Sequence, residues 1–168
     1  INPLKVRNKE HTIEKPIKTI YVPNAVVKKA GAKIGNQKEC ERIISLIEEI
    51  ANDKTYDGKT IGIIALQNSD VYIKKLIDMT MKSFGEKFIK ERKIKIGNTY
   101  DFQGDERDVI ILGMVISSID TEGEKYHFQP LTKLEFDRSF NVAASRAKEQ
   151  MILVHSVTLE ELNPNCNR

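Results

Sequence analysis

The stretch TYDFQGDE, residues 99–106, gathers groups that could bind a polar ligand. Gly104 lets the backbone approach a ligand closely, because it has no Cβ. Thr99, Gln103 and Glu106 add hydrogen-bonding groups, and Glu106 could accept from sugar hydroxyls. The stretch follows an expected strand, and ligands of open α/β sheets gather at the carboxyl ends of strands. It is therefore a candidate ligand site, although a loop that only caps strand ends would show the same pattern.

Arg146 is the second candidate, since arginine offers a planar fork of donors that matches phosphate. The small residues Ala143, Ala144 and Ser145 precede it on an expected helix, where they would let the helix pack closely and hold Arg146 in one direction. An arginine that caps the helix or forms an ion pair near its C-terminus explains the same pattern without a ligand. The residues alone leave both interpretations open.

The segment DKTYDGKT, residues 53–60, ends like a phosphate-binding P-loop, G-x-x-x-x-G-K-[ST]. Asp53 stands where the first glycine must be, and it places a negative charge where phosphates would lie. The segment also runs from an expected helix into a strand, which is the reverse of a P-loop. We interpret it as an exposed turn, so these 168 residues contain no Walker-type nucleotide anchor.

The elements that must position these groups alternate between strand and helix. Asn36 is a suitable N-cap for a helix, with Glu39 at the capping-box position. The apolar run at 60–66 is typical of a strand covered on both faces, and the longest run, 108–117, is predicted to be the central strand. Further expected elements are strands at 17–22, 93–98 and 151–156, a loop at 24–35, and helices at 36–52, from Ser69 or Asp70 to about Ser83, and at 137–148. This order predicts an α/β fold with a mostly parallel sheet and helices on both faces.

The two longer expected helices have apolar residues at helical spacing. The first would bury Cys40, Ile43, Ile44, Leu46, Ile47 and Ile50. The second would bury Val71, Ile73, Leu76 and Ile77. Both patterns indicate packing against a sheet.

Composition constrains the partners only weakly. A net charge of +3, from 27 basic and 24 acidic residues, is too small to indicate nucleic-acid binding by itself. Cys40, Cys166 and the 3 histidines fit no metal-ligand spacing, so we expect no metal site and reduced thiols in a cytoplasmic protein. No apolar run approaches the ~20 residues that span a bilayer, so we expect no membrane partner.

Residues 1–16 are polar, contain Pro3 and Pro16, and are expected to form an N-terminal arm or linker. Residues 17–168 are expected to form a single domain. The chain opens on Ile1 rather than Met, so we expect it to be a fragment of a larger protein.

Three segments, in the expected order, resemble motifs of the second RecA-like domain of superfamily 1 DNA and RNA helicases, most closely the 5′-to-3′ branch. TIGIIALQNSDVYIKKL at 60–76 is similar to motif IV, KIGNTYDFQGDERDVIIL at 95–112 to motif V, and FNVAASRAKEQMILVHS at 140–156 to motif VI. The resemblance covers residues 36–156 and implies a RecA-like three-layer sandwich. It departs from the family at Ala65-Leu66-Gln67, where motif IV often has a Thr-Pro-aromatic run, so no contacts of that motif are carried over.

The resemblance implies a role for each candidate residue. Arg146 would reach the γ-phosphate of ATP and stabilise the charge of the transferring phosphoryl group. Gly104 would approach the phosphates through its backbone, and Glu106 would bind the ribose or fix the site. The other implied roles are coupling of the nucleotide to nucleic acid by Thr99 and Gln103, bracing of motif VI by Asn141 and Ser145, and steering toward phosphate or nucleic acid by Lys148.

The resemblance also implies the cofactors and partners. ATP and Mg²⁺ would be held mainly by a first RecA-like domain, which these residues lack, and the chain would act on single-stranded DNA or RNA as half of an ATP-dependent helicase or translocase. Without the P-loop, these residues alone are expected to hydrolyse no ATP. Two alternatives stay open: the motor part of a helicase-nuclease of restriction or repair type, and a non-catalytic module that docks nucleic acid or protein.

Overall fold

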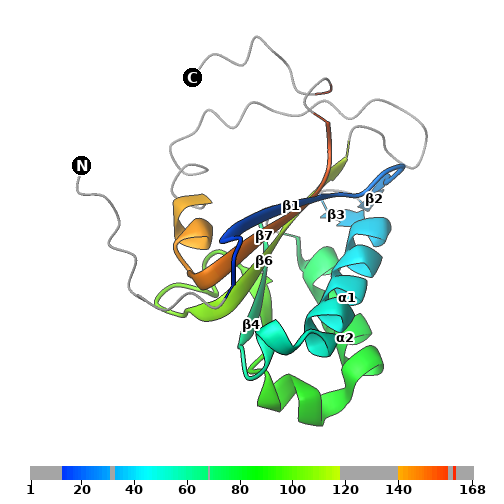
Figure 1. The fold of residues 1–168 in the computed structure, drawn as a ribbon. Helices are drawn as coiled ribbons and strands as arrows, with labels where there is room; N and C mark the ends of the chain where they lie inside the picture. Colours follow the sequence, from blue (N-terminus) through cyan, green and yellow to red (C-terminus); the bar gives the residue numbers. More distant parts are fainter. Residues whose placement is uncertain (1–12, 31–32, 68, 118–139, 159–160, 162–168) are drawn as a thin grey trace, which may run out of the picture.

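Strands and helices alternate along most of the chain, of which the computed structural model describes residues 13–30, 33–67, 69–117, 140–158 and 161 (Figure 1). The elements are β1 Ile17–Tyr21, β2 Val27–Ala30, β3 Lys33–Asn36, α1 Gln37–Asn52, the 3₁₀ turn η1 Lys54–Tyr56, β4 Ile61–Ala65, α2 Asp70–Glu91, β5 Lys95–Asn98, β6 Arg107–Ser117 and β7 Ala147–Ser156. Residues 140–144 are also helical. In the described part, no helix is both long and apolar enough to cross a membrane.

Five strands form a parallel sheet in the order β1-β7-β6-β4-β5. The predicted central strand, β6, lies in the middle of this order. All five residues of β4 are buried, as expected for a strand covered on both faces. The amino ends of the strands lie toward the left and lower left of Figure 1, and the carboxyl ends toward the upper right. The predicted α/β class with a mostly parallel sheet is confirmed.

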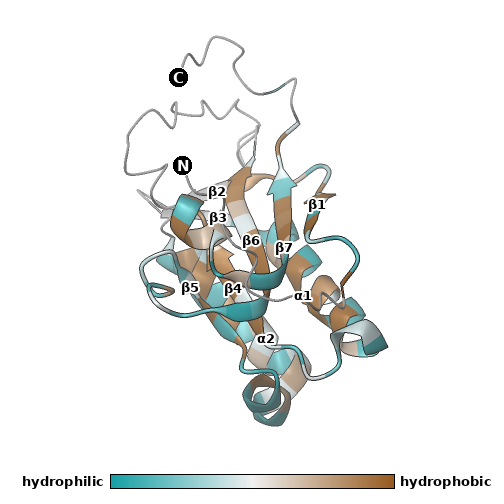
Figure 2. Cartoon of the chain, turned by 60° about the vertical axis from the view of Figure 1, so that its left-hand side comes forward, coloured by the Kyte–Doolittle hydropathy of each residue, from teal (hydrophilic) through white to brown (hydrophobic). Residues whose placement is uncertain are grey.

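Each face of the sheet has its own apolar core. On one face α1 and α2 pack over side chains from β4, β6 and β7. On the other face Phe102 and Ala143 cover Ile64, Ile110 and Leu112. The strands between these layers are the most hydrophobic part of the chain, whereas the outer surfaces of the helices are largely polar (Figure 2). Helical layers on both faces, with 140–144 on the second, give the three layers that were predicted.

The expected loop at 24–35 is wrong, because β2 and β3 form an antiparallel hairpin there. The pairing joins Val27 to Asn36, directly before α1 begins. The segment lacks the alternation of apolar and polar residues that marks a strand in sequence. Pairing between β2 and β3 satisfies their amide and carbonyl groups, and Val27 is fully buried, so tertiary contacts make this segment a strand.

The second helix also differs from its prediction. It continues past Ser83 to Glu91, and Gly85, at φ 71° and ψ 171°, lets the chain leave the helical path and resume it. Its buried stripe is Tyr72, Leu76 and Thr80, whereas the predicted core residues Val71 and Ile77 are 40% and 44% exposed. Leu76 is buried as predicted and Ile73 is half-buried against the same core, whereas the Tyr72 side chain, whose burial was not predicted, is turned into the interior.

The first helix begins as predicted, with the Asn36 side chain accepting from the Glu39 amide at 3.1 Å. The Glu39 carboxylate is completely buried, and its Oε1 accepts from the Tyr72 hydroxyl at 2.6 Å and from the Val115 amide at 2.8 Å. Val115 adopts φ 71°, an uncommon conformation for a β-branched residue. Ser156 donates to the other oxygen, Oε2, at 3.4 Å. One carboxylate thus joins α1, α2, β6 and β7.

Burial raises the pKa of Glu39 to about 7, although the hydrogen bonds from Tyr72, Val115 and Ser156 oppose the rise. Between the ordinary value of 4.5 and about 7, the folded chain binds more protons than the unfolded chain. Stability contributed by protonated Glu39 is therefore lost as the pH rises through this window. Glu39→Gln should remove that part of the pH dependence, which is worth roughly 3 kcal/mol of unfolding free energy.

Urea denaturation at about pH 5 and about pH 8 measures this difference between wild type and variant. Glu48→Gln, an exposed position on the same helix, is the matched control and should keep the wild-type pH dependence. The prediction would be contradicted if the unfolding free energy changed by the same amount between the two pH values in wild type and in Glu39→Gln.

Phe102 provides a second test, on the opposite face of the sheet. Its ring is fully buried against Ile110 and Leu112, whereas Tyr100 in the same connection is 55% exposed. Phe102→Ala should lower the unfolding free energy by about 3–5 kcal/mol, because it leaves a cavity in this core. Tyr100→Ala should cost about 1 kcal/mol or less. Similar losses for the two variants in urea unfolding would show that Phe102 does not hold this face.

Candidate functional site

The amino ends of β6 and β7 bring the two candidate segments together. Arg107, the first residue of β6, pairs with Ala147, the first residue of β7. The Arg107 amide donates to the Arg146 carbonyl at 3.0 Å. Glu106 directly precedes Arg107, so the end of the 99–106 loop and Arg146 lie on neighbouring strand starts. The structure therefore joins two segments that lie some forty residues apart in sequence.

The expected location at the carboxyl ends of strands is wrong for most of this loop. Thr99, which is buried, follows the last residue of β5 at the carboxyl edge. Parallel strands start at the same edge, so the chain must return across the sheet before β6 begins. Phe102 packs on the sheet face along that path, and Gly104 and Glu106 come after it, toward the amino edge. Thr99 is thus separated from Arg146, whereas Glu106 is brought close to it.

Local hydrogen bonds hold the first half of the loop. The Asn98 side chain accepts from the Tyr100 amide at 2.8 Å and from the Asp101 amide at 3.1 Å. The Asp101 carboxylate accepts in turn from the Asn98 amide at 2.8 Å. Short polar side chains of this kind stabilise a turn through their own backbone. The loop therefore leaves β5 in a defined direction.

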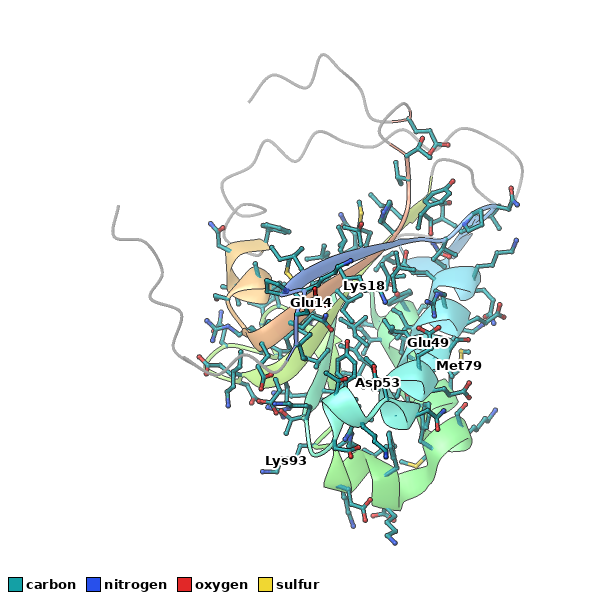
Figure 3. All side chains as sticks on the ribbon, viewed as in Figure 1. Glu14, Lys18, Glu49, Asp53, Met79 and Lys93 are labelled. Atoms are coloured by element: carbon teal, nitrogen blue, oxygen red, sulfur yellow. The ribbon has the colours of Figure 1, made fainter. Side chains whose placement is uncertain are left out.

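The second half is held by ion pairs at the amino edge. The Asp105 carboxylate accepts from Lys95 at 2.8 Å and from Arg107, and these hydrogen bonds lower the pKa of Asp105. Arg107 also donates through Nε to the Lys93 carbonyl at 2.9 Å. Lys93, labelled in Figure 3, lies at the lower left beside the amino ends of the strands. Both ends of the loop are thus fixed.

Gln103 and Gly104 form the exposed corner of the loop. Gly104 has φ 77°, a conformation that other residues adopt at a cost, and the space that a Cβ would occupy is open within 4 Å. Glu106 is half-buried beside it. This corner presents exposed backbone and a neutral amide side chain, which suits a ligand that is read through main-chain groups.

The helix that carries motif VI ends earlier than predicted. Helical structure covers 140–144, and Ser145 and Arg146 form a turn before β7 begins at Ala147. The first residues of the predicted helix, 137–139, lie outside the described part. The reason for the early end is the pairing of Ala147 with Arg107, which draws residues of helical propensity into the sheet.

The turn orients the Arg146 side chain. Ser145 Oγ donates to the Val142 carbonyl at 2.9 Å and accepts from Arg146 Nη2 at 2.8 Å, while Arg146 Nε donates to the same carbonyl at 3.1 Å. Asn141 contributes its backbone carbonyl, which accepts from the Ser145 amide at 3.1 Å. Among the described residues, no carboxylate forms an ion pair with Arg146. The hydrogen bonds to Ser145 and Val142 therefore hold the guanidinium in one orientation.

Sequence reasoning missed four residues at this edge: Lys59, Thr60, Asp108 and Glu149. The segment that ends in Lys59 and Thr60 was expected to be an exposed turn, yet both residues are half-buried. Burial alone would raise the pKa of Asp108, but the hydrogen bonds from Thr60, with the charges of Lys148 and Lys59, lower it. Lys148 itself is exposed on β7. A signal was available in the sequence, because Thr60 and Asp108 each stand directly before an apolar run, Ile61–Ala65 and 109–112.

The amino edge carries groups that could bind an anion. It combines an oriented guanidinium, the exposed Gly104 backbone and the cationic Lys148. In the part of the chain that the structure describes, no group of three or more His, Cys, Asp and Glu side chains could hold a metal ion. Guanidinium forks and backbone amides are the groups that bind phosphate oxygens.

Comparison with known proteins identifies the family. A family model described as an AAA domain matches residues 3–158. The zebrafish (Danio rerio) protein named "Putative helicase mov-10-B.2" is 37% identical over 97 residues, which are 57% of this chain and 9% of that protein. The Saccharomyces cerevisiae "DNA polymerase alpha-associated DNA helicase A" is 32% identical over 130 residues, which are 75% of this chain and 17% of that protein. The chain thus spans less than a fifth of either relative.

The match covers all three segments that resemble helicase motifs, and the parallel sheet with its helical layers agrees with a RecA-like fold. The chain therefore belongs to the AAA-domain family, as a superfamily 1 helicase-like domain.

Proposed function

We propose that this chain is the second, C-terminal RecA-like half of an ATP-dependent helicase or translocase. In this proposal Arg146 completes an ATP site whose P-loop and Mg²⁺ ligands lie on a first RecA-like domain. The observation that carries the proposal is the hydrogen bond of 3.0 Å from the Arg107 amide to the Arg146 carbonyl, which joins motifs V and VI at one edge. The names of the two relatives, both helicases, support the same class.

Two features of the amino edge support the proposal that it faces the phosphates of a nucleotide. Arg146 has no carboxylate partner among the described residues and keeps donors for a further acceptor. The open space at Gly104 leaves room for close approach to its backbone. In the proposal, Arg146 and Gly104 face the phosphates, Gln103 lies at the same corner, and Glu106 binds the ribose or fixes the site.

ATP, when bound, supplies the phosphoryl group whose transfer to water releases the free energy for movement. Negative charge on that group is stabilised by a preorganised cation, which here is the guanidinium of Arg146. Ser145 and the Val142 carbonyl hold this guanidinium in place, so little reorganisation is required during the reaction. The residues of this chain thus orient and stabilise charge, and none of them is assigned a proton transfer.

The other end of the 99–106 loop supports a link to nucleic acid. Thr99 lies at the carboxyl edge and Gly104 toward the amino edge, so one braced loop connects the two edges of the sheet. We place single-stranded DNA or RNA at the carboxyl edge, held mainly by backbone contacts. Thr99 and Gln103 would then transmit changes between the two sites, and Lys148 would attract phosphate at the amino edge.

Arg146→Ala in the full-length protein tests the ATP site. Loss of the guanidinium should lower ATP turnover by about 10³-fold or more, the usual worth of an arginine finger, with a smaller effect on ATP binding. Arg42→Ala is the control, because Arg42 lies on α1 in an ion pair of 2.8 Å with Glu49. It should leave turnover unchanged. A change of less than a few-fold for Arg146→Ala in steady-state phosphate release would remove the proposed role.

The isolated 168 residues provide a second test. They should release no phosphate from ATP, because the sequence has Asp53 where a P-loop requires its first glycine. Phosphate release with and without Mg²⁺ measures this. Mg²⁺-dependent turnover that Arg146→Ala abolishes would show that the chain holds ATP by itself.

A further inference from the structure

The Gly58-Lys59-Thr60 segment, which only resembles a P-loop, makes side-chain contacts across the amino edge. Both the Thr60 amide and the Thr60 hydroxyl donate to Asp108 Oδ2, at 2.8 and 2.7 Å. The Asp108 amide donates back to the Thr60 hydroxyl at 3.0 Å. These three hydrogen bonds close a ring between the residue before β4 and the second residue of β6. We call this ring the Thr60–Asp108 clamp.

A second contact reinforces the clamp. Lys59 forms an ion pair of 2.5 Å with Glu149 on β7, and the two side chains are only 19% and 5% exposed. Partial burial of such a pair makes it more sensitive to geometry than a surface ion pair. The starts of β4, β6 and β7 are therefore tied to each other by side chains as well as by the sheet.

The clamp lies one residue from the backbone that holds Arg146. Asp108 follows Arg107, whose amide donates to the Arg146 carbonyl at 3.0 Å. Displacement of the start of β6 would therefore move the turn that orients the Arg146 guanidinium. Because a misplacement of about 1 Å can reduce a reaction rate about 10²-fold, such a turn needs firm support.

We propose that Thr60 and Asp108 are positioning residues for Arg146 in ATP hydrolysis. The inference rests on the proposed function and assigns no nucleotide contact to either residue. Lys59 and Glu149 strengthen the same support from the side of β7. Residues 58–60 would thus act on ATP hydrolysis indirectly, because they align the starts of β4, β6 and β7 and so position Arg146.

The test is a double-mutant cycle in the full-length protein. Thr60→Val keeps the shape of the side chain and removes its hydroxyl, so it should lower kcat for ATP by about 10-fold to 10²-fold with little change in KM. Thr60→Ser restores the hydroxyl and should return kcat close to wild type. Thr19→Val, at an exposed threonine of β1, is the control and should have no effect.

The cycle is completed with Thr60→Val in the Arg146→Ala background. If the clamp acts through Arg146, the second substitution should lower kcat no further. Affinity for ADP–aluminium fluoride, which mimics the transferring phosphoryl group, gives a binding readout that does not depend on residual turnover. Thr60→Val should weaken this affinity when Arg146 is present and leave it unchanged when Arg146 is absent.

The outcomes separate the two proposals. No effect of Arg146→Ala alone would overturn the proposed function, and the clamp proposal with it. If Arg146→Ala lowers kcat strongly, two results would overturn the clamp proposal only. One is a wild-type kcat for Thr60→Val, and the other is an equal loss of kcat from Thr60→Val with and without Arg146. If Thr60→Val does not fold, as judged by circular dichroism, Asp108→Asn takes its place in the same cycle, because it removes the charge that accepts both Thr60 hydrogen bonds.

Discussion

The hydrogen bond from the Arg107 amide to the Arg146 carbonyl is the interaction on which the candidate site depends. It exists because β6 and β7 are parallel neighbours whose first residues, Arg107 and Ala147, lie in register. Two segments that carry different groups are therefore placed side by side at one edge. The glycine-containing loop arrives from β5, and the arginine arrives from a helix on the second face. A shift of either strand would separate them.

The register itself is supported differently at the two edges of the sheet. At the amino edge, hydrogen-bonded and charged pairs join strand starts, as in the contact of Thr60 with Asp108. At the carboxyl edge, the buried carboxylate of Glu39 accepts from the Val115 amide and from the Tyr72 hydroxyl. A buried acid is costly unless it is hydrogen-bonded or protonated, and its raised pKa reflects that cost. The apolar interior between these edges supplies most of the stability, and the polar contacts supply the alignment.

Features that depend on local patterns could be predicted from the sequence. The apolar runs identified β4 and β6, and Asn36 identified the start of α1, because these signals lie within a few neighbouring residues. Features set by tertiary pairing could not be predicted. Ala147 lies in an alanine-containing stretch that suits a helix, yet pairing with Arg107 makes it the start of β7. The burial of Tyr72 in place of Val71 depends on the distant Glu39 in the same way.

For the candidate site too, the residue types could be predicted from the sequence, whereas their place in the sheet could not. The residue types of Gly104 and Arg146 indicated where binding chemistry could occur, but the edge of the sheet was misassigned, since ligands of open α/β sheets are usually found at the carboxyl ends of strands. Phe102 explains the difference, because its ring packs on the sheet face between the two ends of the loop. Thr99 stays at one edge while Gly104 is carried toward the other. In the proposed function, this loop would link the ATP site at one edge of the sheet to the nucleic acid at the other, because Phe102 holds its middle on the sheet and hydrogen bonds hold both of its ends.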